Sequence, residues 1–192
     1  MSNPKLPYTI ILPSGGVIMI DSLPPRPLRT ESAIRGEYRN VERSAWHNIA
    51  RTILNDRNAQ FEYNNSGAPQ IVGSTLHISV SHSTTLVAVI ISPLRCAIDI
   101  ESLTRHFDRV ASRYITPTEA QLNNDNPDQK ALLWSIKECL YKYADQKELN
   151  LIGDLQVAKL TPPHFTGSIV PHQQSIQGIA TTILNHSLAY IG

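Results

Sequence analysis

Residues 76–101 contain three strand-like segments in succession, and they restrict the folds that this chain can adopt. Residues 76–83 and 86–91 have the composition of strands. Ser92-Pro93 interrupts the pattern, and residues 95–101 resume it. We therefore expect three neighbouring strands joined by short turns.

The segments before these strands predict a hairpin and a helix. Residues 8–12 and 17–20 flank Pro-Ser-Gly-Gly, where glycine permits a tight turn. Residues 22–28 carry three prolines and predict an extended connection. Residues 37–54 have helical spacing, with an apolar stripe at Val41, Ala45, Ile49 and Ile53 and a parallel ridge at Arg39, Arg43, His47 and Arg51. A solvated face would also explain that ridge.

Helices and then strands follow residue 101. We expect a helical piece over 107–115, a short helix opened by the capping box Thr116-Pro-Thr-Glu119, a loop over 123–128 and a long helix to about 145. Residues 175–184 and 187–191 predict antiparallel strands. This order predicts an α+β fold built as two halves side by side, residues 1–94 and 95–192.

Composition narrows the functional classes. The net charge of +1, from 17 basic and 16 acidic residues, gives no reason to expect nucleic acid or an anionic membrane as the main partner. Cys96 and Cys139 lie in different contexts and predict buried thiols in a reducing compartment. Pro13, Gly15 and Gly16 interrupt the N-terminal apolar stretch, so we expect neither a signal peptide nor a spanning helix, and a cytoplasmic location by default.

Carboxylates gather on one strand and one helix. In residues 95–101 the two-residue period of a strand sends Asp99 and Glu101 to the same face, opposite Ile98 and Ile100. A strand end that shows its acids to solvent would give the same pattern.

The long helix has an apolar sector and a chemically different opposite sector. The apolar sector contains Leu132, Leu133, Ile136, Cys139, Leu140, Tyr143 and Ala144, and the opposite one contains Trp134, Lys137, Glu138, Tyr141 and Lys142. A tryptophan is unusual on a solvent face, so this sector is expected to face something, although a charged outer face with one tryptophan remains open. Three carboxylates with two lysines suit a hard cation such as magnesium and a phosphate ligand. His82 and its flanking serines end a strand where donors can reach an anion, though a lone histidine there is often structural.

Taken together, these segments resemble the 4′-phosphopantetheinyl transferases, of the broad-range monomeric type that activates surfactin synthetase. The resemblance spans residues 67–160 and is carried by Ser81-His82-Ser83, by Ala97-Ile-Asp-Ile-Glu101 and by Trp134-Ser-Ile-Lys-Glu-Cys-Leu-Tyr-Lys142. It implies two similar α/β halves in a pseudo-twofold arrangement with coenzyme A in the cleft between them. The implied reaction moves the 4′-phosphopantetheine group from coenzyme A to a serine of an apo acyl, peptidyl or polyketide carrier protein, and it releases 3′,5′-ADP.

The resemblance also assigns roles. Magnesium ligands are expected at Asp99, Glu101 and Glu138, and coenzyme A contacts at Arg43, Ser81, His82, Lys137 and Lys142. Our mechanistic hypothesis makes Glu138 the base for the serine hydroxyl and Lys142 the partner of the leaving phosphate. A rim of Arg105, Arg109 and Arg113 could dock an acidic carrier protein.

Two departures from the family pattern concern the phosphate shell and the acidic strand. The family loop Gly-Lys-Pro is Gly67-Ala68-Pro69 here, so one phosphate-binding lysine is absent, and Arg51 or Lys147 could compensate. Ala97 replaces a glycine. Two alternatives stay open, a relative that only binds carrier proteins or nucleotides and a metal-dependent nuclease. The nuclease fits less well because its Glu and Lys lie two apart on a strand, whereas Glu138 and Lys142 lie four apart on a helix.

Overall fold

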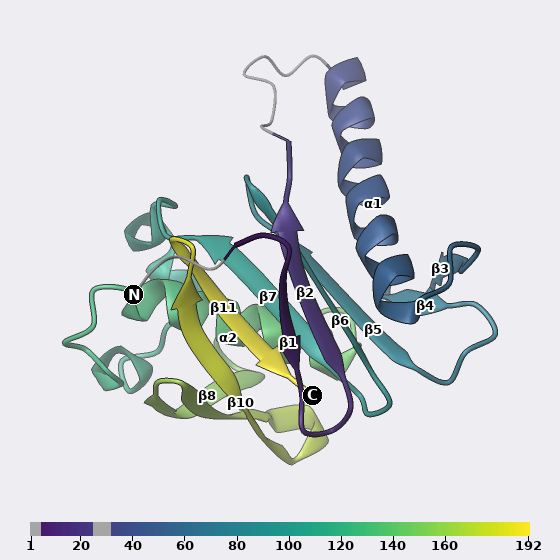
Figure 1. The fold of residues 1–192 in the computed structure, drawn as a ribbon. Helices are drawn as coiled ribbons and strands as arrows, with labels where there is room; N and C mark the ends of the chain where they lie inside the picture. Colours follow the sequence, from purple (N-terminus) through teal and green to yellow (C-terminus); the bar gives the residue numbers. More distant parts are fainter. Residues whose placement is uncertain (1–4, 25–31) are drawn as a thin grey trace.

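The computed structural model describes residues 5–24 and 32–192, with side chains of the first helix described from Glu37 onward. Within these residues the fold mixes eleven strands with two α helices (Figure 1). Their bounds are β1 Tyr8–Ile11, β2 Val17–Ser22, α1 Ser32–Leu54, β3 Phe61–Tyr63, β4 Pro69–Ile71, β5 His77–His82, β6 Leu86–Ser92, β7 Ala97–Ser102, α2 Gln129–Ala144, β8 Leu155–Thr161, β9 His164–Ile169, β10 Gln174–Ile183 and β11 His186–Ile191.

The main strands form two antiparallel sheets, and each sheet carries one helix. The first has the order β1-β2-β6-β5, with α1 packed across β2 and β6. The second has the order β7-β11-β10-β9-β8, and α2 packs on the face of this sheet that is turned away from the first sheet (Figure 1). The short β3-β4 hairpin lies beside the end of α1 (Figure 1). The chain passes from the first sheet to the second between β6 and β7.

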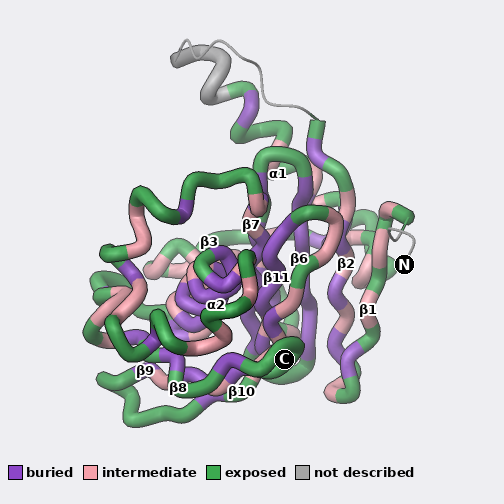
Figure 2. Tube along the Cα trace, turned by 90° about the vertical axis from the view of Figure 1, so that its left-hand side faces the viewer, coloured by how far each residue is buried: buried purple, intermediate pink, exposed green. Residues whose placement is uncertain are grey.

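The strands at the centre are buried on both faces because the sheets pack together between the helices (Figure 2). On β6, Leu86, Ala88 and Ile90 join a core with Ile98 and Ile100 of β7, whereas the intervening valines face α1. Such double burial explains why β6 is a continuous apolar run. No helix in the described part of the chain is both long and apolar enough to span a membrane.

The sheets meet along the edges of β5 and β7, which lie side by side without a backbone ladder. The Ser79 hydroxyl accepts a hydrogen bond from the Ile98 amide at 3.2 Å, and the Ser81 hydroxyl accepts one from the Ile100 amide at 3.2 Å. Both pairs advance in the same direction along the chain, so the two strands run parallel. Serine side chains thus satisfy amides that an edge strand would leave unpaired.

Most predicted elements are confirmed, including the N-terminal hairpin, the long helix and the two last strands. The two short helices expected over residues 107–115 and after Thr116 do not form as α helices. Short 3₁₀ turns replace them at Phe107–Arg109, Ala111–Arg113 and Glu119–Gln121. The capping box itself forms, with Thr116 N to Glu119 Oε2 at 2.9 Å and Glu119 N to Thr116 Oγ1 at 3.2 Å. The expected extended connection lies largely outside the described residues.

The packed face of α1 includes three of the four predicted stripe residues, Ala45, Ile49 and Ile53, but not Val41. Val41 is 37 % exposed, whereas Trp46, Ile49 and Ala50 are buried against the first sheet. The helix begins at Ser32 and extends past the sheet (Figure 1). Spacing of small and β-branched residues therefore misses the large Trp46 side chain that dominates the contact.

Candidate active site

Asp99 lies at the centre of the site, buried between β7 and α2. The alternation predicted for β7 is confirmed, since Ile98 and Ile100 enter the core between the sheets while Asp99 faces the helix. Its Oδ1 accepts hydrogen bonds from Lys142 Nζ at 2.8 Å and from Ser81 Oγ at 2.9 Å. Its Oδ2 is buried and has no hydrogen-bond partner among the described residues. A buried carboxylate oxygen without a partner is costly, and the site gains stability when a ligand satisfies it.

Glu138 lies close enough to Asp99 and Glu101 to feel the negative charge of both. Burial raises the pKa of Glu138, the negative charge of Asp99 raises it further, and the cations Lys142 and Arg105 partly offset both effects. Glu101 also raises the pKa of Glu138. Glu101 forms an ion pair with Arg105 and accepts a hydrogen bond from the Ser102 amide at 2.9 Å. The structure therefore brings together the three carboxylates that the sequence singled out.

These residues fit a hard cation, although no group of three or more acidic, histidine or cysteine side chains in the described residues already has the geometry of a metal site. The unpartnered Asp99 Oδ2 offers a ligand oxygen, and the mutual repulsion of Asp99, Glu101 and Glu138 would be relieved by a divalent ion. Magnesium prefers such oxygen donors and keeps open positions for water and phosphate.

Two lysines of α2, Lys142 and Lys137, have different surroundings. Lys142 Nζ donates to Asp99 and to the Ile98 carbonyl at 3.0 Å, and its side chain is 27 % exposed at the cleft. Lys137 was predicted on the same sector and is instead fully buried, paired with Glu119 at 2.6 Å and bonded to the carbonyls of Leu151 and Leu155. Its predicted contact with a coenzyme phosphate is wrong for this arrangement, because its ammonium is enclosed by protein partners.

The predicted coenzyme A contacts of the first half lie in two different places, Ser81 inside the protein and His82 with Arg43 at a surface hollow. The Ser81 hydroxyl accepts from Ile100 and donates to Asp99, so it supports the carboxylate from inside the protein. His82 is partly exposed, with Nδ1 3.6 Å from Glu42 Oε1. It lines a hollow of about 390 Å³ together with Arg39 and Arg43. Two arginines and a histidine can receive an anion there.

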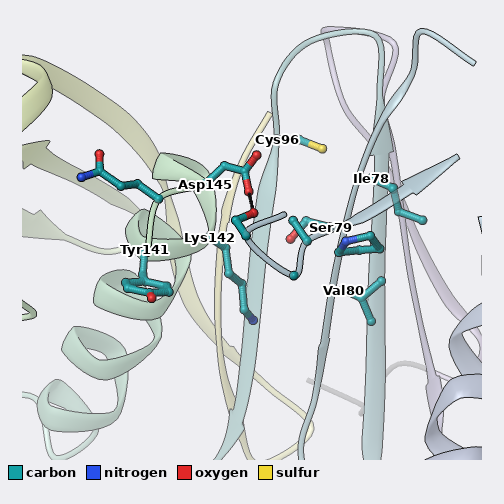
Figure 3. Close-up of a pocket in the computed structure, with 12 residues that line it drawn as sticks. Ile78, Ser79, Val80, Cys96, Tyr141, Lys142 and Asp145 are labelled. Atoms are coloured by element: carbon teal, nitrogen blue, oxygen red, sulfur yellow. Dashed lines mark hydrogen bonds between the residues drawn. The ribbon is translucent and has the colours of Figure 1, made fainter. Parts of the chain in front are cut away.

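A cleft lies between residues 1–94 and residues 95–192, and side chains of both halves line it. One hollow of about 200 Å³ is lined by Ala68, Pro69, Ile78, Val80, Cys96, Tyr141 and Lys142 (Figure 3). Lys142 thus borders both this hollow and Asp99. A neighbouring hollow of about 340 Å³ shares Ala68, Pro69, Cys96 and Lys142 with it. The walls of the first hollow are largely apolar, those of its neighbour are more polar, and charged groups lie at defined positions, as is common in ligand sites.

The sequence reasoning missed Asp145 and Asn64, which meet across this cleft. Asn64 belongs to an Asn- and Gly-containing turn that the sequence does identify as a loop. Asp145 ends α2 without any recognisable motif, and no local pattern links it to a residue 81 positions earlier. Arg105, expected at a docking rim, instead pairs with Glu101 and lies 4.2 Å from the Trp134 ring centroid.

Comparisons with known proteins agree with the second half of the site. No curated protein matches the chain. Residues 95–186 match the family model of the 4′-phosphopantetheinyl transferase superfamily. The matched segment includes Asp99, Glu101, Glu138 and Lys142. The match supports the 4′-phosphopantetheinyl transferase superfamily for this chain.

Proposed function

We propose that the protein is a magnesium-dependent 4′-phosphopantetheinyl transferase of the broad-range, monomeric type. It transfers the 4′-phosphopantetheine group of coenzyme A to a serine of an apo acyl, peptidyl or polyketide carrier protein and releases 3′,5′-ADP. The observation that carries this proposal is the Asp99–Lys142 pair: Asp99 keeps a buried carboxylate oxygen without a partner among the described residues, and Lys142 lines the cleft between the halves. The family match over the same residues supports the reaction class.

The cleft has a suitable order of features for coenzyme A. Arg39 and Arg43 supply positive charge for the phosphate of the nucleotide end, and His82 lines the same hollow. The loop with Gly67 and Pro69 lines both this basic hollow and the apolar one. Lys142 then lies at the far wall of the apolar hollow, next to the acidic cluster. A diphosphate in this region would place its reacting phosphorus near Lys142 and Asp99.

Asp99, Glu101 and Glu138 would hold magnesium, which when bound supplies positive charge to the diphosphate. The serine oxygen of the carrier protein attacks the β-phosphorus, and the bond from that phosphorus to the bridging oxygen of 3′,5′-ADP breaks. Glu138 accepts the hydroxyl proton, and the Lys142 ammonium neutralises the leaving phosphate. Ser81 keeps the Asp99 carboxylate oriented throughout, because its hydroxyl is fixed by the Ile100 amide.

Intact mass spectrometry tests the proposal. The protein is incubated with coenzyme A, magnesium and several apo carrier proteins, and the mass gain of one phosphopantetheine arm on a carrier is the expected result. Asp99→Ala is the negative control. Asp125→Asn, a change at an exposed loop carboxylate, is the matched positive control. The proposal would be contradicted if none of the carrier proteins gained this mass in the presence of the protein, coenzyme A and magnesium.

The same protein preparation separates the two rival functions. A pure binder would retain coenzyme A in equilibrium dialysis but modify no carrier protein. A metal-dependent nuclease would cut plain duplex DNA when magnesium is added, and we expect no such cleavage. The acidic cluster argues against a pure binder, because three carboxylates beside a diphosphate would weaken binding unless a cation joins them.

A further inference from the structure

Asp145 ends helix α2 in a conformation that its residue type does not favour. Its backbone is left-handed, with φ of 50°, and its amide donates to the Lys142 carbonyl at 3.2 Å. Glycine is the usual residue at such a position. A carboxylate at a helix C-terminus also faces the negative end of the helix dipole. Asp145 therefore breaks two local rules, which points to a role outside the helix.

The Asp145 carboxylate contacts the other half of the molecule. Asn64 Nδ2 donates to both carboxylate oxygens, at 3.1 and 2.9 Å, and the Ser66 hydroxyl is within hydrogen-bond distance of Oδ1 (the dashed line at Asp145 in Figure 3). Asn64 lies 81 positions earlier in the chain, after β3. These bonds join the loop of the first half to the helix that carries Glu138 and Lys142.

Asn64 in turn organises its own loop. Its Oδ1 accepts hydrogen bonds from the Ser66 amide at 3.0 Å and the Ala68 amide at 2.8 Å. The Ser66 hydroxyl lies 2.6 Å from the same oxygen, and its single proton can go either there or to Asp145 Oδ1. The Gly67 amide donates to the Asn64 carbonyl at 3.0 Å. With donors and acceptors of Asn64 all engaged, residues 64–68 form one rigid turn. Asp145 contacts two residues of this turn, Asn64 and Ser66.

The turn forms a wall of the cleft. Ser66, Gly67, Ala68 and Asp145 all line the apolar hollow that also contains Lys142. Movement of the turn away from α2 would widen this hollow without displacing Asp99 or Glu138, which lie on β7 and the middle of α2. Loss of the Asp145 contact would therefore change the width of the cleft and leave the geometry of the acidic cluster unchanged.

We infer that Asp145 is a positioning residue that fixes the 64–68 loop against α2 and so sets the fit of the cleft around coenzyme A. This inference rests on the proposed function. The contact has added importance here because Ala68 supplies no side-chain charge, so the loop contributes to binding through its position. Losing the contact raises the KM for coenzyme A and leaves kcat nearly unchanged.

Asp145→Gly is the decisive variant because glycine favours the left-handed backbone and removes only the side-chain contact. We expect a Tm equal to or above that of the wild type, a KM for coenzyme A raised about fivefold and kcat within about twofold. Asp145→Asn tolerates the same backbone and keeps one acceptor oxygen, so its KM should fall between the two.

Amide hydrogen exchange reads the loop directly and does not depend on catalysis. Exchange at Ala68 should become faster in Asp145→Gly, because its acceptor Asn64 is released. Gln173→Gly is the matched control. It changes another left-handed residue, φ 51°, at an exposed position outside the cleft, and should alter neither exchange at Ala68 nor KM.

Unchanged exchange at Ala68, or an unchanged KM, in Asp145→Gly would overturn the inference. A wild-type protein that modifies no carrier would instead refute the proposed function. In that case faster exchange at Ala68 in the glycine variant would still support the loop contact, and equal exchange would reject it.

Discussion

Two lysines of helix α2 each form an ion pair with a buried carboxylate from another element. The two pairs differ in how fully their polar atoms are satisfied by hydrogen bonds. Lys137 and Glu119 are 0 % and 3 % exposed, and Lys137 also donates to two backbone carbonyls. Glu119 accepts from the Val157 amide at 2.7 Å and from the Thr116 amide at 2.9 Å. This network ties the helix to the 116–121 turns and to β8, and it offers nothing to a ligand.

The second pair is incomplete. Lys142 is 2.8 Å from Asp99, but Asp99 Oδ2 lacks a partner and Lys142 reaches the cleft. A fully satisfied buried network restricts conformation, whereas an unsatisfied one marks a place where another group belongs. Five positions along one helix thus separate a structural lysine from a lysine of the candidate active site.

The largest expected effect comes from removing the incomplete pair. Asp99→Ala and Glu138→Ala should each reduce the transfer rate by about 10⁴-fold, since charge stabilisation and proton transfer both depend on them. Both variants should fold, because the oxygen atoms removed are not part of a complete network. Carrier modification followed by intact mass gives the rate, and circular dichroism checks the fold. A rate close to that of the wild type in either variant would remove its residue from the mechanism.

Breaking the complete pair, Lys137 with Glu119, should lower the free energy of unfolding. Lys137→Met leaves the Glu119 carboxylate buried without its cation, and we expect the free energy of unfolding to fall by about 3–5 kcal/mol. Urea denaturation measures the loss, and the exposed Lys147→Met is the control. The double variant Lys137→Met/Glu119→Gln should recover part of the loss because no unpaired charge remains. A KM for coenzyme A that rises in the folded single variant would revive the phosphate contact predicted for Lys137.

The sequence predicted which sides of β7 and α2 face each other, but not which α2 side chains lie in the core and which reach the cleft. The two-residue period of β7 placed Asp99 correctly, and the helical period placed Glu138 and Lys142 correctly. Lys137 lies only about 20° around the helix from Ala144, at the edge of the apolar sector, so periodicity alone could not decide its side. Its partner Glu119 comes from a turn whose tertiary position has no sequence signal. The contact of Asp145 with Asn64 is likewise set only when the halves pack together.

The seam between the sheets offers a finer test of the incomplete pair. Ser79→Ala and Ser81→Ala each leave one β7 amide without its acceptor, so each should lose about 1–3 kcal/mol in the free energy of unfolding. Only Ser81 also donates to Asp99. We therefore expect a reduced kcat in Ser81→Ala and an unaltered kcat in Ser79→Ala. Equal kcat values would show that Asp99 needs no support from β5.

The smallest expected effect concerns Cys96, whose thiol borders the cleft. Burial raises the pKa of Cys96 from 9.0 to about 12. In the unfolded chain this thiol ionises above pH 9, whereas in the folded protein it stays protonated. The unfolded state is therefore favoured progressively as pH rises through 9, and the stability that Cys96 contributes should fall by about 1 kcal/mol between pH 8 and 10.

Cys96→Ala isolates this effect, because the volume it removes has the same cost at every pH. The difference in unfolding free energy between wild type and variant, measured in urea at pH 8, 9 and 10, should shrink as pH rises. A constant difference would mean that the thiol ionises equally well in the folded protein. The apolar wall shared by the two hollows would then be accessible to water, and the complete network around Lys137 would be the drier of the two environments on α2.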